Sequence, residues 1–263
     1  LVGSPGLAVG NVVGSNISNI LLILGVAAII APIAVSPGAV KRDLLGMSAV
    51  TLVYVGLGMS GQIVFWQGAL MLIALMSYIG FTVWHDNKSN DEVAELHREE
   101  AAEMGTIPLR TVSIAGIIIV GLFAVVVGAE WLVTGATTLA MECSVPGEVI
   151  GLTVVAIGTS LPELATSIVA AYRGHSDVCV GNVLGSNLFN LFGITGVTAM
   201  FTPLPFSDKI VSFDLWILLA ATALIIPFML SGRRISRLEG SILLVLYVVF
   251  IASQFLGMSG MPT

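Results

Sequence analysis

Charged residues are few in this sequence. Asp, Glu, Lys and Arg make up only 10% of its 263 residues, whereas 56% are hydrophobic. A soluble domain usually carries about a quarter of its residues as these four types. A water-soluble globule of this length is nearly excluded, because so few charges could not cover its surface. With a mean hydropathy of +1.01, the composition instead predicts an all-α polytopic membrane protein.

Basic residues are outnumbered and cysteine is nearly absent. The chain has 10 basic against 16 acidic residues, a net charge of −6, and no basic stripe along which nucleic acid could bind. Its two cysteines, Cys143 and Cys179, fall near opposite membrane faces in the topology below, which excludes a disulfide between them. The sequence therefore predicts no nucleic-acid partner, and nothing in it requires an obligatory protein partner.

Side chains typical of catalysis are missing from the apolar stretches. These stretches contain no histidine, no facing pair of Asp residues and no Ser–Lys dyad. His85, His97 and His175 are scattered over the polar connections, so a histidine metal site is not expected. The sequence therefore predicts neither an enzyme nor a bound cofactor.

Eight apolar stretches are long enough to be membrane spans. A bilayer core of about 30 Å needs roughly 20 apolar residues per helix. Turn residues and charges bound the stretches at about 7–34, 44–60, 64–84, 111–140, 147–172, 178–203, 213–231 and 239–258.

The basic residues divide unequally between the two sets of alternating loops. One set holds nine of the ten: Lys41, Arg42, Lys88, Arg98, Arg110, Arg173, Arg233, Arg234 and Arg237. The opposite set holds only Lys209. Cytoplasmic loops carry an excess of Lys and Arg. We therefore expect an integral membrane protein with the loop 85–110 in the cytoplasm.

A polar motif recurs within the apolar stretches. GNVVGSNISN at residues 10–19 returns as GNVLGSNLFN at residues 181–190, an offset of 171 residues. Extended to Gly25 and Gly196, nine of sixteen positions are identical. The two copies lie in the first and sixth spans, which cross the membrane in opposite directions. Paired, interrupted helices in inverted repeats are typical of secondary transporters that bind their substrate near the midplane.

The second copy follows another unusual stretch, GLTVVAIGTSLPELATS at residues 151–167. At the same offset, the counterpart of this stretch would lie before residue 1. We therefore expect the sequence to begin within the first repeat and to lack about two spans.

Pro162 predicts a break in the fifth span. Proline cannot donate to the carbonyl four residues earlier and its ring clashes there, so the helix is expected to open near Gly158. This would free carbonyls around Ala156, Ile157 and Gly158 as possible cation ligands. Thr159 and Ser160 precede Glu163 by four and three residues and share its helical face.

These groups form an all-oxygen set. Hard cations such as Na⁺ and Ca²⁺ prefer oxygen, whereas zinc or copper would call for His and Cys. A carboxylate inside the membrane costs a few kcal/mol and is functional by default. Glu163 is therefore the main candidate ligand.

Two Ser–Asn pairs in the repeated motif are further candidates. Ser15 and Asn19 are four residues apart on one helical face, as are Ser186 and Asn190. In a single copy, small polar residues of this kind would be read as helix packing. Two copies in inverted spans, one of them beside a broken helix with a carboxylate, favour an ion site.

The remaining acidic residues give weaker signals. Glu130 lies near the outer end of its span, and we expect it to have an interfacial or interhelical hydrogen-bonding role. The stretch 85–110 holds seven acids, but their spacing lacks the Asp-rich start and central Gly of an EF-hand. A short solvated linker between two halves is the expected structure there.

GTSLPE at 158–163 followed by GNVLGSN at 181–187, with the second motif also at 10–16, resembles the α-repeats of the sodium/calcium exchanger family. The likeness is to prokaryotic members of this family within the calcium:cation antiporters, which implies a location in a prokaryotic inner membrane. It implies an inverted-repeat antiporter fold of ten helices, of which this chain would hold the third to the tenth. Residues 1–84 would be the remainder of the first half (three helices), 85–110 the linker, and 111–263 the complete second half (five helices).

The resemblance also implies roles for individual residues, and Ca²⁺ and Na⁺ as the transported ions. Glu163 would be one of two central carboxylates, the other being absent from this chain. The further ligands that the resemblance implies are Thr159 for Ca²⁺, Ser160 and the Ala156 carbonyl for Na⁺, Ser15 and Ser186 for sodium sites, and Asn19 and Asn190 at the central amide positions. Some members have Asp at the second central position, so Asn190 removes a possible carboxylate.

The expected function is exchange of Ca²⁺ for Na⁺ by alternating access, with sodium influx driving calcium efflux through movement of the two helices that this chain lacks. One alternative is a proton-coupled calcium antiporter of the same superfamily. Another is a membrane protein that has a structural role and transports nothing.

Overall fold

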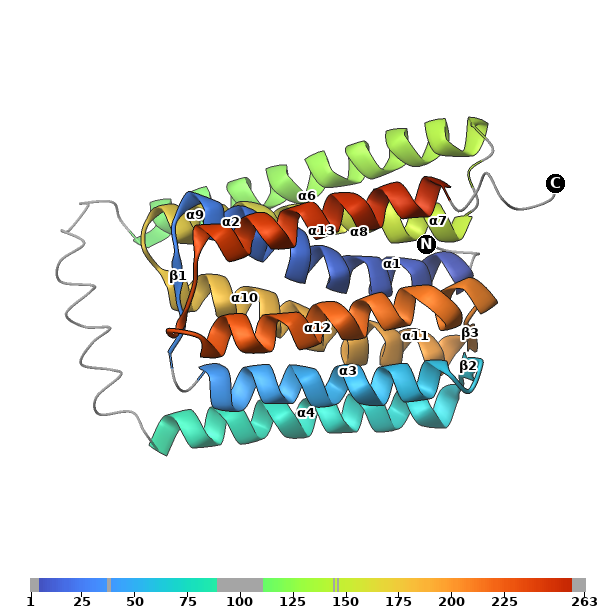
Figure 1. Ribbon diagram of the computed structural model, residues 1–263, viewed down its shortest axis with the longest axis horizontal. Coiled ribbons are helices and arrows are strands. Elements are labelled where there is room, and N and C mark those ends of the chain that lie inside the picture. Colours follow the sequence, from blue (N-terminus) through green and yellow to red (C-terminus); the bar gives the residue numbers. More distant parts are fainter. Residues whose placement is uncertain (1–4, 37–38, 89–110, 144, 146, 257–263) are drawn as a thin grey trace.

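The computed structural model describes residues 5–36, 39–88, 111–143, 145 and 147–256. Long apolar helices run alongside one another in a single bundle (Figure 1). Most of the acidic stretch 85–110 lies outside the described residues. Its first four residues continue the preceding helix, so this helix extends further than the apolar pattern indicates.

The first part of the chain forms three helical segments. Their elements are α1 (Pro5–Ser18), the π-helical turn η1 (Asn19–Ile23) and α2 (Leu24–Ile30), then η2 (Ala39–Leu44) with α3 (Leu45–Gly58), and finally α4 (Phe65–Lys88).

The second part forms five. Their elements are α6 (Thr111–Glu142), then α7 (Gly147–Ile150), η3 (Gly151–Val155), α8 (Ala156–Thr159) and α9 (Leu161–Tyr172), then α10 (Ser176–Leu188), η4 (Phe189–Ile194) and α11 (Thr195–Phe201), then η5 (Ile210–Asp214) with α12 (Leu215–Leu230), and finally α13 (Arg237–Leu256).

A helix thus lies in each of the eight apolar stretches. By length and composition, six are able to cross a membrane, and the bent pair Gly151–Thr159 and Leu161–Tyr172 adds a seventh if it is one span. The helix in the stretch 44–60, α3, has only 14 residues. The chain is an integral membrane protein, and the count of eight crossings stays a prediction.

The repeat extends well beyond the polar motif. Both copies change from α-helix to a π-helical turn within one residue of the same point of the repeat, after Ser18 and after Leu188. The elements that follow also correspond: η2–α3 to η5–α12, and α4 to α13. From the helix that carries the motif onward, each half therefore consists of the same three helical segments in the same order, although little sequence identity remains beyond the motif.

Short strands join the two halves at both ends of the bundle. β1 (Ile33–Ala34) pairs antiparallel with β4 (Arg234–Ile235), and β2 (Gln62–Ile63) pairs with β3 (Leu204–Pro205). The two pairs lie at opposite ends of the helices (Figure 1). Because each pair takes one strand from each half, the halves are tied together at both ends.

Helices of each half also pack against helices of the other half. α13 of the second half packs on α2 of the first, and α4 of the first packs on α11 of the second. A Cβ on Gly240 would lie 2.9 Å from the carbonyl oxygen of Gly25, so the first pair of backbones nearly touches. Lipid tails are as apolar as leucine, so close packing of this kind is the main force between membrane helices.

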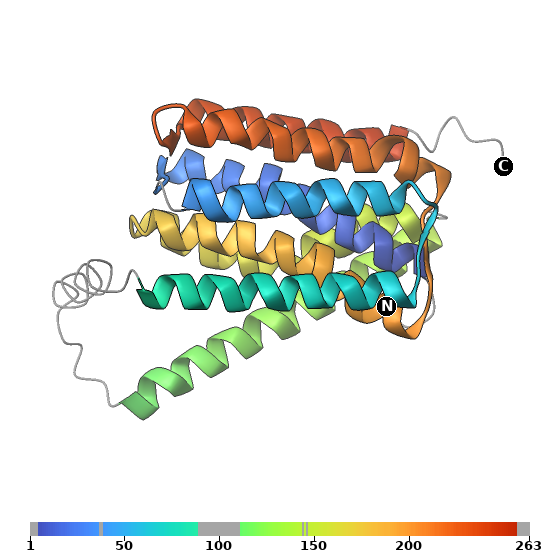
Figure 2. The ribbon, with the colours of Figure 1, turned by 90° about the horizontal axis from the view of Figure 1, so that it is seen from below.

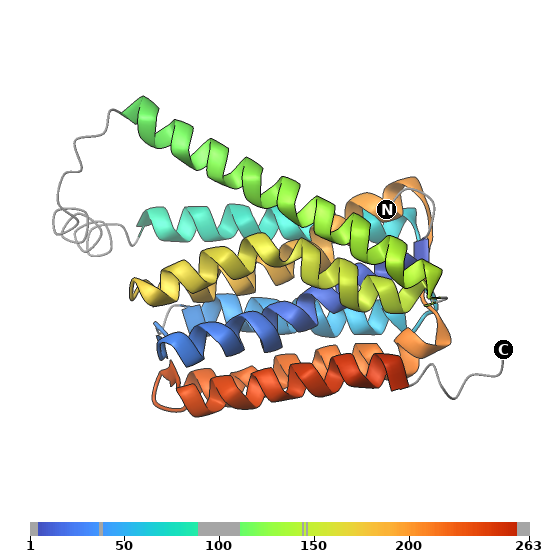
Figure 3. The same cartoon turned by 90° about the horizontal axis from the view of Figure 1, so that it is seen from above.

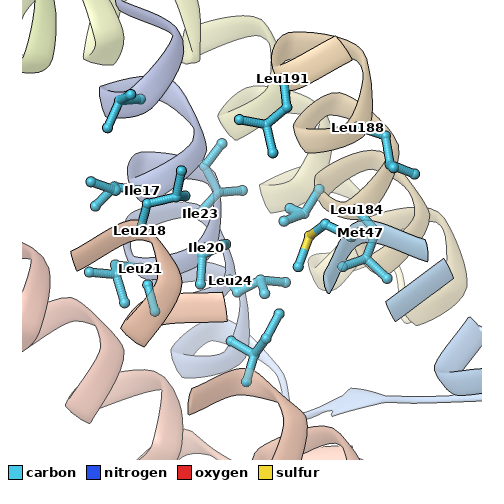
Figure 4. Packing of buried hydrophobic residues seen from close by; sticks show 14 of the residues in the cluster. Ile17, Ile20, Leu21, Ile23, Leu24, Met47, Leu184, Leu188, Leu191 and Leu218 are labelled. Atoms are coloured by element: carbon cyan, nitrogen blue, oxygen red, sulfur yellow. The ribbon is translucent and has the colours of Figure 1, made fainter. Parts of the chain in front are cut away.

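The buried core lies between the two copies of the motif. Ile17, Ile20 and Leu24 of the first copy and Leu184 of the second are fully buried in one cluster, together with Met47 of α3. Figure 4 shows these side chains gathered at the centre of the bundle. This core fixes the position of α1 relative to α10.

Helix α6 is peripheral. It diverges from the other helices (Figures 2 and 3) and packs mainly against α7–α9 and the turn η3. Large apolar side chains are exposed along it, such as Phe123 at 68% and Trp131 at 77%. Lipid is the natural environment of such a surface.

Candidate ion-binding site

The fifth expected span is broken where the sequence predicts. α8 ends at Thr159 and α9 begins at Leu161, with a bend of 51° between the two helical segments. Pro162 lies in the first turn of α9, where a missing N–H costs nothing. The break therefore places Ser160 at the corner and Glu163 in the first turn of α9.

The carbonyls before the break are less free than expected. The Ser160 N–H lies 3.1 Å from the carbonyl oxygens of both Ala156 and Ile157. The Thr159 hydroxyl lies 3.3 Å from the Ala156 oxygen. The expectation of unoccupied carbonyls at these two residues is therefore wrong, because the N–H at the corner folds back onto them. A carbonyl oxygen has two lone pairs, so it can still take a further ligand.

Five of the eight predicted site residues surround one cavity of about 270 Å³. They are Ser15 of α1, Thr159, Ser160 and Glu163 at the helix break, and Asn190 of η4. Asn11, Val12, Phe189 and Ile194 complete the lining. The cavity thus joins the first copy of the motif, the broken helix and the second copy.

Glycine allows α1 to approach the broken helix closely. A Cβ on Gly14 would overlap the backbone oxygen of Leu152 and lie 2.8 Å from the Cβ of Ala156. The next residue, Ser15, consequently reaches Thr159, with 3.0 Å between the two hydroxyl oxygens. The close approach of the backbones thus brings together ligands from two distant parts of the chain.

Glu163 supplies the carboxylate of the cavity. Its Oε2 atom is buried and has no hydrogen-bond partner within the described part of the chain. Its backbone oxygen accepts a hydrogen bond of 3.1 Å from the Asn182 amide, which also donates to Ser167 at 3.0 Å. Buried carboxylate oxygens are nearly always paired. An unpaired one beside a cavity whose lining includes hydroxyl and amide groups indicates a place for a cation.

The other three predicted residues do not line the cavity. Ala156 is buried, and its carbonyl oxygen accepts a hydrogen bond from the Thr159 hydroxyl. Ser186 is partly buried on α10. The Asn19 amide donates to Asn187 Oδ1 at 3.0 Å, while its own Oδ1 has no partner among the described residues. Asn187 in turn donates to the sulfur of Met47 at 3.5 Å. Whether these three residues bind ions stays a prediction.

Asn11 was not anticipated as part of the site. Its Oδ1 accepts from Ser15 at 3.3 Å and from Thr159 at 3.1 Å. The available signal was its position in the repeated motif, four residues before Ser15 and 171 residues before Asn182. That signal marks the residue without revealing its contacts.

Glu130 borders a second cavity, of about 610 Å³, between α6 and the broken helix. Its lining includes Thr134, Thr137 and Pro162, and it shares Thr159 with the first cavity. No hydrogen bond in the described structure assigns Glu130 the expected interhelical role, which stays a prediction.

The described residues contain no group of three or more His, Cys, Asp or Glu side chains that could hold a metal ion. Cys143 is exposed and Cys179 is buried, and both are free. The polar groups in the lining of the first cavity are one carboxylate, hydroxyls and amides.

The chain is similar to known proteins in both sequence and overall structure. A family model described as sodium/calcium exchanger protein matches residues 1–84 and 113–256. The chain is 36% identical over 253 residues to putative antiporter CaxA of Alkalimonas amylolytica, covering 95% of this chain and 77% of that protein. It is 36% identical over 201 residues to inner membrane protein YrbG of Escherichia coli, covering 75% of this chain and 61% of that protein.

A solved structure of the sodium-calcium exchanger NCX_Mj, soaked with Na⁺ and Sr²⁺, superposes with a TM-score of 0.74. The identity is 32%, and the match covers 95% of this chain and 77% of that one. This likeness makes the chain a transporter rather than an enzyme, with the fold that the inverted repeat indicated. The chain belongs to the sodium/calcium exchanger family.

Proposed function

We propose that this chain exchanges Ca²⁺ for Na⁺ across the membrane by alternating access. The observation that carries the proposal is the cavity between α1 and the broken helix. There the unpaired carboxylate oxygen of Glu163 shares one space with the hydroxyls of Ser15 and Thr159. Oxygen ligands of this kind suit Na⁺ and Ca²⁺ and leave softer metals without a preferred donor.

One shared carboxylate favours exchange over simple binding. Glu163 can be neutralised by either cation, and one carboxylate cannot offset the charges of a Ca²⁺ and a Na⁺ at the same time. An empty site leaves a charge unpaired inside the membrane, which is costly. Reorientation only when an ion is bound would then couple the movement of one ion to the opposite movement of the other.

The individual roles in this proposal are those that the resemblance of the motifs to the sodium/calcium exchanger family implies. In this proposal Glu163 binds both ions, Thr159 contributes to the Ca²⁺ site, and Ser160 with the Ala156 carbonyl contributes to a Na⁺ site. The remaining proposed ligands are Ser15 and Ser186 for Na⁺, with Asn19 and Asn190 at the centre.

The positive charges support an orientation. The β1–β4 pair lies beside Arg233, whose carbonyl accepts from Val35, and the backbone N–H of Ala34 donates to Ser176. The loops that carry most of the basic residues therefore meet at one end of the bundle, whereas Lys209 lies near the β2–β3 pair. We propose that the basic end, together with residues 85–110, faces the cytoplasm of a prokaryotic cell.

Neutralising Glu163 tests the function. Liposomes that contain the chain and an outward Na⁺ gradient are expected to accumulate radiolabelled Ca²⁺, and Glu163→Gln is expected to abolish the accumulation because the ions lose their carboxylate. Glu142→Gln is the matched control, since Glu142 is exposed at the end of α6. Persistent uptake by Glu163→Gln would overturn the assignment of the site.

A further inference from the structure

Asn11 connects the two hydroxyls that face each other across the helix contact. Its side chain is 5% exposed and lines the cavity. Its Oδ1 atom lies 3.3 Å from the Ser15 hydroxyl and 3.1 Å from the Thr159 hydroxyl, and the two hydroxyls are 3.0 Å apart. Three polar side chains from two helices thus form a closed triangle beside Glu163.

The directions of the two hydroxyl protons decide whether Ser15 and Thr159 can both bind a cation. Each hydroxyl carries one proton and two lone pairs. Without an ion, one hydroxyl can donate to the other. When both oxygens face a cation, neither proton can lie between them, so both must point to acceptors elsewhere. Asn11 Oδ1 has two lone pairs and lies within reach of both.

Thr159 has one other acceptor among the described hydrogen bonds, the Ala156 carbonyl at 3.3 Å. That carbonyl already accepts the Ser160 N–H, and it is itself a proposed ligand. With an ion on the Ala156 oxygen, Asn11 remains the acceptor for the Thr159 proton. For Ser15, the described hydrogen bonds offer Asn11 and Thr159 alone.

We propose that Asn11 is a positioning residue of the transport site. Its Oδ1 atom accepts hydrogen bonds from the hydroxyls of Ser15 and Thr159, so that the lone pairs of both hydroxyls point toward the cation. Asn11 does not bind the ion itself. This inference rests on the proposed exchange function and adds a residue to it.

The equivalent asparagine of the second copy has a different task. Asn182 donates, through its amide, to the Glu163 carbonyl and to Ser167. Asn11 accepts hydrogen bonds from Ser15 and Thr159, whereas Asn182 acts as a donor. Replacement by Asp, which keeps an acceptor and removes the donor, should therefore be tolerated at position 11 and harmful at position 182.

The test compares Asn→Asp and Asn→Leu at both positions. Asp keeps the acceptor oxygens and removes the amide donor, whereas Leu removes both. The measurements are the half-saturating Na⁺ and Ca²⁺ concentrations and the maximal rate of Ca²⁺ uptake in liposomes. A second measurement is the rise in melting temperature of the purified chain when NaCl or CaCl₂ replaces choline chloride.

Asn11→Leu should raise both half-saturating concentrations about tenfold and leave the maximal rate within about twofold, as expected for loss of ligand orientation. Asn11→Asp should leave them unchanged or lower, because it keeps the acceptor and adds negative charge. Asn182→Asp should impair uptake, because a carboxylate would face the Glu163 carbonyl.

An Asn11→Asp variant as impaired as Asn11→Leu would overturn the proposal, as would an Asn11→Leu variant with unchanged half-saturation. If Asn11→Leu does not fold, the half-saturating concentrations of Asn11→Asp decide: unchanged or lower values support the proposal, and higher values overturn it. If the wild-type chain transports no Ca²⁺, exchange fails, but the melting measurement still tests Asn11. Absence of any ion-dependent shift in the wild-type chain would overturn both proposals.

Discussion

At the scale of single residues, most of the polar side chains that line the cavity are neutral. Within the described part of the chain, Glu163 is the one acidic residue in its lining, beside three hydroxyls and two amides. A Ca²⁺ ion on these ligands keeps one positive charge uncompensated by them, whereas a Na⁺ ion is matched. The balance between the two ions therefore depends on charge at positions such as Asn190.

Asn190→Asp is expected to shift this balance toward Ca²⁺. A second carboxylate makes the site neutral with Ca²⁺ bound but leaves it negative with a single Na⁺, and the attraction of a divalent ion is twice as large at equal distance. The half-saturating Ca²⁺ concentration of uptake should fall by about tenfold, which corresponds to about 1.4 kcal/mol.

Asn190→Ser is the neutral control and should not lower that concentration. An unchanged value in Asn190→Asp would mean that Asn190 is too far from the ion to act on it.

Much of the site could be predicted because its signals are local. A proline inside an apolar span, a carboxylate one residue later and hydroxyls on the same face all appear within a few residues of sequence. Asn11 could not be found in this way. Its role depends on which atom of its amide meets Thr159, 148 residues away. The occupied carbonyls of Ala156 and Ile157 were missed because the geometry of the helix corner decides where the Ser160 N–H points.

At the scale of elements, the site depends on the approach of α1 to the broken helix. The repeated motif has small residues along the contact, and Gly14 lies where α1 meets Leu152 and Ala156. Gly56 of α3 is exposed, and a Cβ added there would meet no described atom within 4 Å. These two glycines therefore allow a matched comparison.

Gly14→Ala is expected to reduce both Ca²⁺ uptake and the melting temperature. The added methyl group would force α1 away from α8, and the Ser15–Thr159 contact would be lost with it. Overpacking of this kind typically costs about 1–3 kcal/mol.

Gly56→Ala should preserve uptake and leave stability equal or slightly higher, because alanine favours helix over glycine. Equal behaviour of the two variants in the uptake and melting measurements would contradict the role given to the contact.

The element boundaries show what the apolar pattern can and cannot indicate. Hydropathy located all eight helical stretches, since each needs a long apolar segment. It could not reveal the π-helical turns or the continuation of α4 to Lys88, because these depend on backbone hydrogen bonding rather than on polarity. The short strands were likewise missed, since two-residue strands leave almost no sequence signal.

At the scale of the whole molecule, the two halves form one interlocked frame. Strand pairs join the two halves at both ends. In addition, α2 of the first half packs on α13 of the second, and α4 of the first packs on α11 of the second. α6 stands apart from this frame and contacts chiefly the helix that carries Glu163. This division suits alternating access, in which a rigid part holds some ligands while other helices move.

The inverted repeat predicted this frame only in part. Opposite orientation of the two motifs follows from the even number of expected spans, four, that lie between the first and the sixth. The packing of helices of one half on helices of the other could not be predicted from the sequence, because it depends on close contacts such as that between Gly25 and Gly240.

Exchange itself is tested by Ca²⁺ uptake into liposomes that contain the wild-type chain and hold Na⁺, choline or acid inside, with identical medium outside. The account predicts uptake only with internal Na⁺, and none with choline or with a pH gradient in sodium-free medium. Uptake driven by the pH gradient would contradict sodium coupling and indicate proton coupling, and equal uptake in all three would contradict exchange.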